Sequence, residues 1–168
     1  MDTSPARLRL TTHIPALGPR GEGWVLIQAT LLAGVVVAGL EGARWPEPLR
    51  GPVLAIAIIS GTAGLGLVAS AAATLGTSVS PFPKPPATSE LKGSGIYALV
   101  RHPIYGGILL VSVAWSLGLS PWALIPTGAL AVALGFKSRL EERWLIDRHP
   151  AYAGYRARVR RRFVPYLW

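Results

Sequence analysis

The sequence contains no cysteine and little charge. The absence of cysteine excludes disulfides and thiol chemistry. The three histidines, His13, His102 and His149, are far apart in sequence, so no metal site is predicted. Charged residues make up 15% of the chain, against about 25% in an average soluble domain. They are missing altogether from long blocks, a pattern that is typical of membrane proteins.

Long uncharged segments predict membrane-spanning helices. The first is Trp24–Leu40, and a second lies within the uncharged block Gly51–Pro83, where Pro52–Leu75 is the predicted span. The block Pro103–Phe136 is also uncharged and would run about 51 Å as one helix. This length exceeds the hydrocarbon core of about 30 Å, so the block is too long for one straight span.

A turn is therefore predicted inside this last block. Pro121 disfavours helical conformation at Ser120, and we expect a helical hairpin with the arms Ile104–Leu119 and Trp122–Phe136. Both arms are short for full spans, which predicts extension into the flanking sequence or a locally thin membrane. A hairpin also brings its two outer ends to the same face of the membrane.

The basic residues predict the orientation of the chain. The net charge is +9, and Lys and Arg gather in the N-terminal flank, in the linker Gly76–Gly95 and in the tail from Lys137. Four spans place these regions on one side, which the positive-inside rule assigns to the cytoplasm. Four prolines predict that the linker is extended rather than helical.

The expected fold is an all-α polytopic membrane bundle of about four transmembrane helices, with a C-terminal helical hairpin and a cytoplasmic amphipathic tail. It forms a single membrane domain, residues 1–168, in the cytoplasmic membrane with both termini in the cytoplasm. Residues 1–75 supply the N-terminal spans, and residues 76–168 supply the linker, hairpin and tail that form the candidate site.

The tail has the pattern of an interfacial helix. Pro165 is expected to end it, and five arginines lie between residues 156 and 162. Because the positive residues flank apolar blocks, anionic lipid headgroups are the expected partners and no nucleic acid is expected. One helical face carries the apolar and aromatic residues Tyr152, Tyr155, Val159 and Phe163.

Two polar clusters at the ends of the hairpin are the candidate site. The first lies at the start of the hairpin and contains Tyr97, Arg101, His102 and Tyr105. Each of these residues alone also fits a structural role, since arginine anchors membrane flanks and tyrosine occupies the aromatic belt. Their concentration in one short segment favours a binding site.

The second cluster follows the hairpin and contains Lys137, Glu141 and Glu142. Lys137 and Glu141 are four residues apart and can form a helical ion pair. Carboxylates near the hydrocarbon edge are functional candidates by default. Together the clusters suit a zwitterionic or cationic ligand, because carboxylates bind an ammonium group and aromatic faces hold a sulfonium or an adenine. Neither supplies an evident nucleophile for covalent catalysis.

Gly76–Pro165 resembles the isoprenylcysteine carboxyl methyltransferase family and its bacterial relatives, and the related phospholipid N-methyltransferases have a similar layout. The matching features are an Arg-His-Pro-x-Tyr motif at residues 101–105, paired glutamates after a hairpin, and tyrosines before Pro165. The resemblance implies S-adenosyl-L-methionine as the methyl donor and a lipophilic small molecule or lipidated acceptor as the substrate. It implies direct in-line methyl transfer, with alignment of the reactants as the main contribution of the protein.

The resemblance also assigns roles to individual positions. His102 and Lys137 are the candidate catalytic residues, His102 by assisting a proton transfer and Lys137 by its place near the acceptor. Relatives often carry arginine where this chain has Lys137, and lysine lacks the planar bidentate grip of arginine, so the acceptor is expected to differ. Relatives also carry Phe-Gly where this chain has His149 and Pro150. The implied cofactor-binding residues are Leu91, Tyr97, His102, Pro103, Ile104, Tyr105, Glu141 and Glu142.

Two other classes of function remain as alternatives. Membrane sterol reductases have a related C-terminal architecture and use NADPH, although they are generally larger. The arginine-rich tail alone also suits a membrane scaffold or lipid-binding protein without enzymatic activity.

Overall fold

The computed structural model describes residues 14–84 and 91–165, and within these residues the chain is a bundle of helices without strands. His13, the first part of the basic N-terminal flank and two of the linker prolines, Pro85 and Pro86, lie outside the described residues. The α-helices are α1 Glu22–Glu41, α2 Glu47–Leu75, α3 Pro103–Leu119, α4 Leu124–Arg148 and α5 Tyr152–Arg158. Three short 3-10 turns connect them, η1 Gly76–Ser78, η2 Gly95–Ala98 and η3 Pro121–Ala123.

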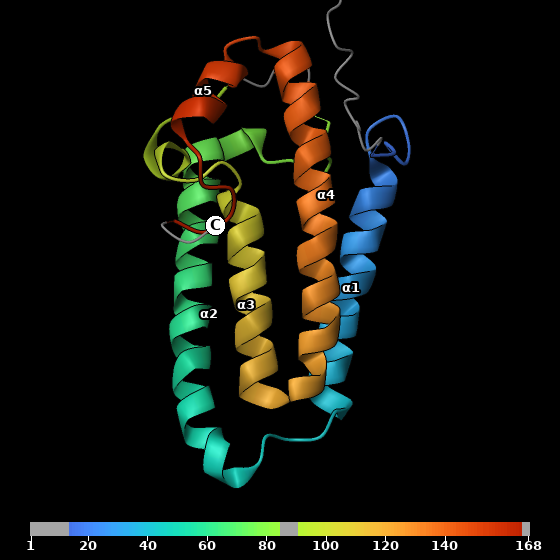
Figure 1. Ribbon diagram of the computed structural model, residues 1–168, viewed down its shortest axis with the longest axis vertical. Coiled ribbons are helices and arrows are strands. Elements are labelled where there is room, and N and C mark those ends of the chain that lie inside the picture. The colour runs from blue at the N-terminus through green and yellow to red at the C-terminus, as the bar shows by residue number, and fades with distance from the viewer. Residues whose placement is uncertain (1–13, 85–90, 166–168) are drawn as a thin grey trace, which may run out of the picture.

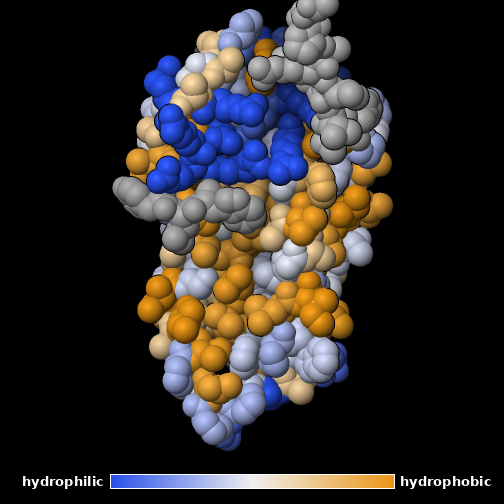
Figure 2. All heavy atoms as spheres, in the orientation of Figure 1, coloured by the Kyte–Doolittle hydropathy of each residue, from blue (hydrophilic) through white to orange (hydrophobic). Residues whose placement is uncertain are grey.

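The four long helices run side by side, with the short α5 across one end (Figure 1). Within the described residues, three helical segments are long and apolar enough to cross a membrane, Glu22–Glu41, Glu47–Leu75 and Pro121–Arg148. The apolar α3 has 17 residues and spans about 26 Å. Figure 2 shows an apolar band across this face of the bundle with a strongly hydrophilic end above it. The expected fold, a helical membrane bundle, is thus confirmed.

The predicted hairpin is present, but its second arm is longer than expected. Ser120 is extended, and its hydroxyl oxygen accepts a hydrogen bond from the Trp122 backbone N–H at 3.3 Å, which caps the turn. The helix that follows does not stop at Phe136, because α4 continues to Arg148. This extension buries Lys137, Ser138, Leu140 and Glu142 against the rest of the protein.

Close contact between α2 and α3 depends on glycine. A Cβ atom at Gly64 would lie 2.8 Å from the carbonyl oxygen of Gly107 and 2.9 Å from Leu110 Cβ, so the two backbones leave no room for a side chain. Nearby, the hydroxyl of Ser60 donates to the Leu110 carbonyl oxygen at 2.8 Å. In a membrane, helices gain little from burying apolar surface against one another, because the lipid tails are equally apolar. Small residues and interhelical hydrogen bonds therefore usually hold them together.

We expect Gly64→Ala to destabilise the bundle by about 1–3 kcal/mol, the usual cost of overpacking. Thermal unfolding of the detergent-purified protein measures the effect. Gly66→Ala is the matched control, because a Cβ at Gly66 meets no atom within 4 Å. Equal stability of the two variants would contradict the close contact of α2 with α3.

The tail forms only the first part of the predicted helix, and this part packs on the protein. The helix α5 ends at Arg158, and the tail loop, residues 159–163, follows it without helical structure. The carbonyl oxygens of residues 159 to 162 all accept hydrogen bonds from Arg101 or His102 instead of from later residues of the tail. The aromatic and apolar face is consequently buried within the protein rather than turned toward lipid, as shown by Tyr152, Tyr155, Val159 and Phe163.

Candidate functional site

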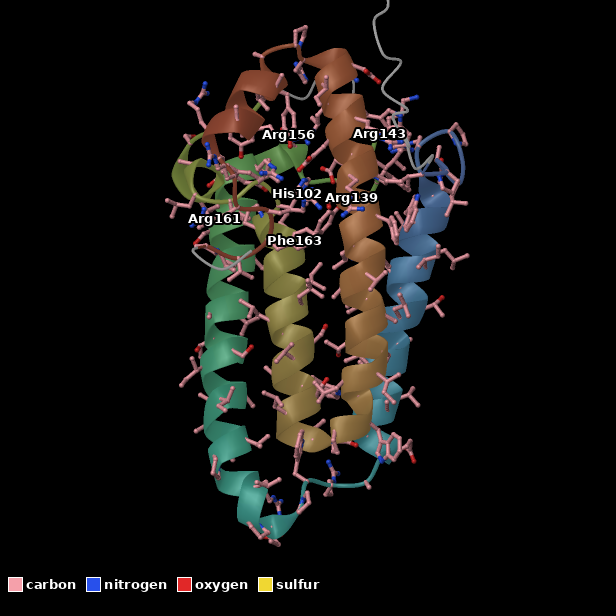
Figure 3. The ribbon with its side chains drawn as sticks, viewed as in Figure 1. His102, Arg139, Arg143, Arg156, Arg161 and Phe163 are labelled. Atoms are coloured by element: carbon pink, nitrogen blue, oxygen red, sulfur yellow. The ribbon has the colours of Figure 1, made fainter. Side chains whose placement is uncertain are left out.

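The two polar clusters meet at the hydrophilic end of the bundle, as the hairpin predicts. The first turn of α3 lies below α5 at this end, and the last turns of α4 rise beside α5 (Figure 1). Figure 3 shows His102 between the upper parts of α3 and α4. A cavity of about 360 Å³ lies here, lined by residues of both clusters, of α5, of the linker and of α1.

Most of the predicted site residues line this cavity, and two do not. Pro103 is buried at the first position of α3, where its fixed φ angle suits the start of a helix. Glu142 is buried on α4 and is absent from the lining. The predicted residues in the lining are Leu91, Tyr97, His102, Ile104, Tyr105, Lys137 and Glu141.

Glu141 presents its carboxylate to the cavity. The hydroxyl of Tyr105 donates to Glu141 Oε2 at 2.9 Å, and Nδ1 of His102 lies 3.7 Å from the same oxygen. The side chain remains 25% exposed, so one carboxylate oxygen is held while the group stays accessible. Such a carboxylate can accept charge-assisted hydrogen bonds from a cationic ligand.

Aromatic rings form one wall of the cavity. The rings of His102 and Tyr105 are stacked, 5.5 Å apart between centroids and inclined by 3°. Tyr97 joins them from η2, and its backbone carbonyl accepts a hydrogen bond from the Tyr155 hydroxyl at 2.7 Å. Burial raises the pKa of Tyr155 to about 12, so its hydroxyl keeps the proton that makes this bond. The tail thereby holds the aromatic wall in place.

Lys137 is a buried cation that faces the cavity. It is 2% exposed, and its Nζ donates to Gln28 Oε1 at 2.6 Å and to the Pro81 carbonyl oxygen at 2.9 Å. Nζ also lies 5.2 Å from the centroid of the Tyr105 ring. The expected helical ion pair with Glu141 is not formed within 4.0 Å between these two described side chains, because neutral oxygens from α1 and the linker hold the ammonium group instead.

Glu142 connects the first cluster to the second. Its Oε1 accepts from Arg101 Nε at 2.8 Å and lies 3.1 Å from His102 Nε2. Two tail arginines approach it more loosely, with Arg156 Nε 3.7 Å from Oε2 and Arg162 Nε 3.9 Å from Oε1. Because an ionised carboxylate only accepts, the bond to Glu142 places a proton on His102 Nε2 and leaves Nδ1 toward Glu141.

Several residues of the site were not predicted from the sequence. Gln28 is the clearest, and the signal was a lone amide in the otherwise apolar segment Trp24–Leu40. Arg101 was assigned to the cluster, but its bonds to the tail carbonyls had no sequence signal. Apolar side chains complete much of the wall, Leu75, Val79, Phe82, Ile108 and Leu145.

Comparison with known proteins does not assign a family. No family model matches the chain, and no curated protein matches it in sequence. A functional assignment therefore rests on the residues of the cavity and their chemistry.

Proposed function

We propose that the protein is an S-adenosyl-L-methionine-dependent membrane methyltransferase that acts on a lipophilic acceptor. The observation that carries the proposal is that a carboxylate, a buried ammonium group and an aromatic wall line the same cavity at the hydrophilic end of a membrane bundle. These groups come from Glu141, Lys137 and the stacked pair His102 and Tyr105.

The residues present fit the chemistry of S-adenosyl-L-methionine. Its ammonium group suits the accessible carboxylate of Glu141, and its carboxylate suits Lys137 or Arg101 in the same lining. Aromatic faces such as those of Tyr97 and Tyr105 stabilise a sulfonium or stack on an adenine. A volume of about 360 Å³ lies within the range of about 300–1,000 Å³ that is usual for small-molecule sites.

When bound, S-adenosyl-L-methionine supplies an electrophilic methyl group. The protein's part is to orient the acceptor, exclude water and manage one proton, which needs no covalent nucleophile. His102 suits the transfer of the proton. Glu142 holds its Nε2, which leaves Nδ1 to take a proton from the methyl-accepting substrate in the cavity. Lys137 would bind or polarise a polar group of the acceptor.

The proposed orientation places the hydrophilic end in the cytoplasm. This end carries most of the Lys and Arg residues, which the positive-inside rule assigns to the cytoplasmic face of the cytoplasmic membrane. Both termini are then cytoplasmic. A water-soluble cofactor reaches the cavity from the cytoplasm, and a lipophilic acceptor, such as an isoprenylcysteine carboxylate or another lipophilic molecule, reaches it from the bilayer.

Binding of labelled S-adenosyl-L-methionine to the detergent-purified protein tests the proposal. Glu141→Gln removes the charge but keeps an oxygen for the Tyr105 hydroxyl, and we expect it to weaken binding about 10–100-fold, the value of one charged hydrogen bond. His102→Ala should weaken it as well. Glu47→Gln is the control, because its side chain is 83% exposed at the start of α2, at the opposite end of the bundle.

Unchanged cofactor binding in both folded site variants would contradict the site. Binding of NADPH in place of S-adenosyl-L-methionine in the same titration would favour a membrane reductase, and binding of neither would favour a scaffold. Incubation of membranes with the methyl-labelled cofactor, followed by identification of the labelled product, then defines the acceptor.

A further inference from the structure

A second cavity lies on the outer side of the tail, away from the groups of the candidate site. Its volume is about 240 Å³. We call it the arginine pocket, and its walls combine three arginines with apolar residues. They are Arg158, Arg160 and Arg161 with Ala98, Leu99, Val159 and Pro165.

The backbone of the tail loop directs these arginines outward. The carbonyl oxygens of Val159 and Arg160 accept from Arg101 Nη1 at 2.7 and 2.8 Å. The Arg161 carbonyl accepts from the backbone N–H of Arg101 at 3.1 Å. Because the buried Arg101 engages these carbonyls from inside, the segment is held in one conformation and the exposed side chains of Arg160 and Arg161 remain on the outer surface.

The arginine pocket lacks an internal counter-charge. No acidic side chain lines it in the part of the chain that the structure describes. Within that part, the ion pairs of the tail run from Arg156 and Arg162 to Glu142, while Arg158, Arg160 and Arg161 form none. Three like charges held together without an acidic partner repel one another, so an anion that binds between them gains affinity from all three.

The surroundings of the arginine pocket indicate which anion it takes. The hydrophilic cap of the bundle lies above the apolar surface band (Figure 2), and Arg156 and Arg161 lie in this cap (Figure 3). Within the pocket, Leu99 is 47% exposed beside the arginines. A ligand that satisfies both features is anionic at one end and apolar at the other.

We propose that the arginine pocket binds the phosphate headgroup of an anionic phospholipid, with the apolar part of the lipid against Leu99. Arginine suits this role because its planar guanidinium binds phosphate oxygens in pairs. The site is independent of the proposed methyl transfer, since it shares no lining residue with the larger cavity.

Calorimetric titration of the detergent-purified chain with short-chain phosphatidylglycerol tests the site, with phosphatidylcholine of the same chain length, whose phosphate is balanced by its own ammonium group, as the comparison without net charge. We expect saturable binding of phosphatidylglycerol only. Replacing Arg158, Arg160 and Arg161 by glutamine should weaken it at least about tenfold, since each basic residue near a membrane surface contributes on the order of 1 kcal/mol. The three exposed side chains make no internal ion pair, so the helical circular dichroism should not change.

A second variant distinguishes specific binding in the arginine pocket from general electrostatic attraction of an anionic lipid to the basic tail. Replacing the same three arginines by lysine keeps the net charge of +9 but removes the paired hydrogen bonds, and affinity should fall several-fold. If the lysine variant and the natural chain bind phosphatidylglycerol with equal affinity, the proposed site is wrong and the lipid is attracted only by the positive charge of the tail. The proposal is also overturned if glycerol phosphate or a short oligonucleotide binds as tightly as phosphatidylglycerol, or if the glutamine variant retains full affinity.

Discussion

Glu142→Ala is expected to lower the free energy of unfolding by about 3–5 kcal/mol, the usual cost of removing one partner from a buried ion pair. The Glu142 side chain is 3% exposed and accepts from Arg101, which is itself buried. Without the carboxylate, the Arg101 guanidinium stays buried with only tail carbonyls as acceptors. The Arg156 and Arg162 side chains also lose their shared partner.

The neighbouring glutamate is the matched control for this prediction. Glu141 has a side chain that is 25% exposed and one hydrogen bond, from the neutral Tyr105 hydroxyl. We expect Glu141→Ala to cost about 1 kcal/mol, the net value of an ordinary hydrogen bond. Thermal unfolding of both variants in the same detergent measures the contrast. If Glu142→Ala melts at the temperature of Glu141→Ala, Glu142 does not organise the site.

Gly106→Ala is expected to release the tail loop from the bundle. Gly106 lies in the first turn of α3, and a Cβ atom there would overlap the backbone carbonyl of Phe163. A backbone atom cannot move aside as a flexible side chain does, so the tail loop must shift and its bonds to Arg101 and His102 must lengthen or break. We expect a loss of at least about 1–3 kcal/mol, the range for overpacking.

Trypsin digestion reports this change directly, because the tail carries five arginines between residues 156 and 162. Cleavage requires local opening of the backbone, and opening becomes easier when the tail loop is displaced. Gly128→Ala in α4 is the control, since a Cβ there meets no atom within 4 Å and alanine is a better helix former than glycine. Cleavage of Gly106→Ala at the rate of Gly128→Ala would contradict the proposed packing of the tail on α3.

The hairpin, and the meeting of its two outer ends, were predictable from local sequence. An uncharged block too long for one span, with Pro121 inside it, requires a turn, and a turn brings the ends of the block together. The positions of His102 and Glu141 near one another follow from that requirement alone. The length of α4 was underestimated, because the prediction ended the arm at the first charge, Lys137, which the structure buries.

The length and the surroundings of the tail helix were mispredicted, because the periodicity of the tail has two explanations. Residues that repeat at helical spacing between arginines suit a helix on a lipid surface, and they suit equally a segment that packs on its own protein. The outcome depends on Arg101, whose guanidinium and backbone compete for carbonyls that a longer helix would use itself. A contact between residues so distant in sequence leaves no local pattern.

Composition and charge patterning by themselves determined that this chain is a helical membrane protein with its polar chemistry at the ends of a hairpin. These properties follow from short-range constraints, namely the cost of charge in hydrocarbon and the stereochemistry of proline. Only the tertiary structure decided how the two adjacent glutamates differ, with Glu141 in the lining of the cavity and the buried Glu142 paired with Arg101. Neighbours on a helix point in different directions, and what each one meets depends on the helices and loops packed around it.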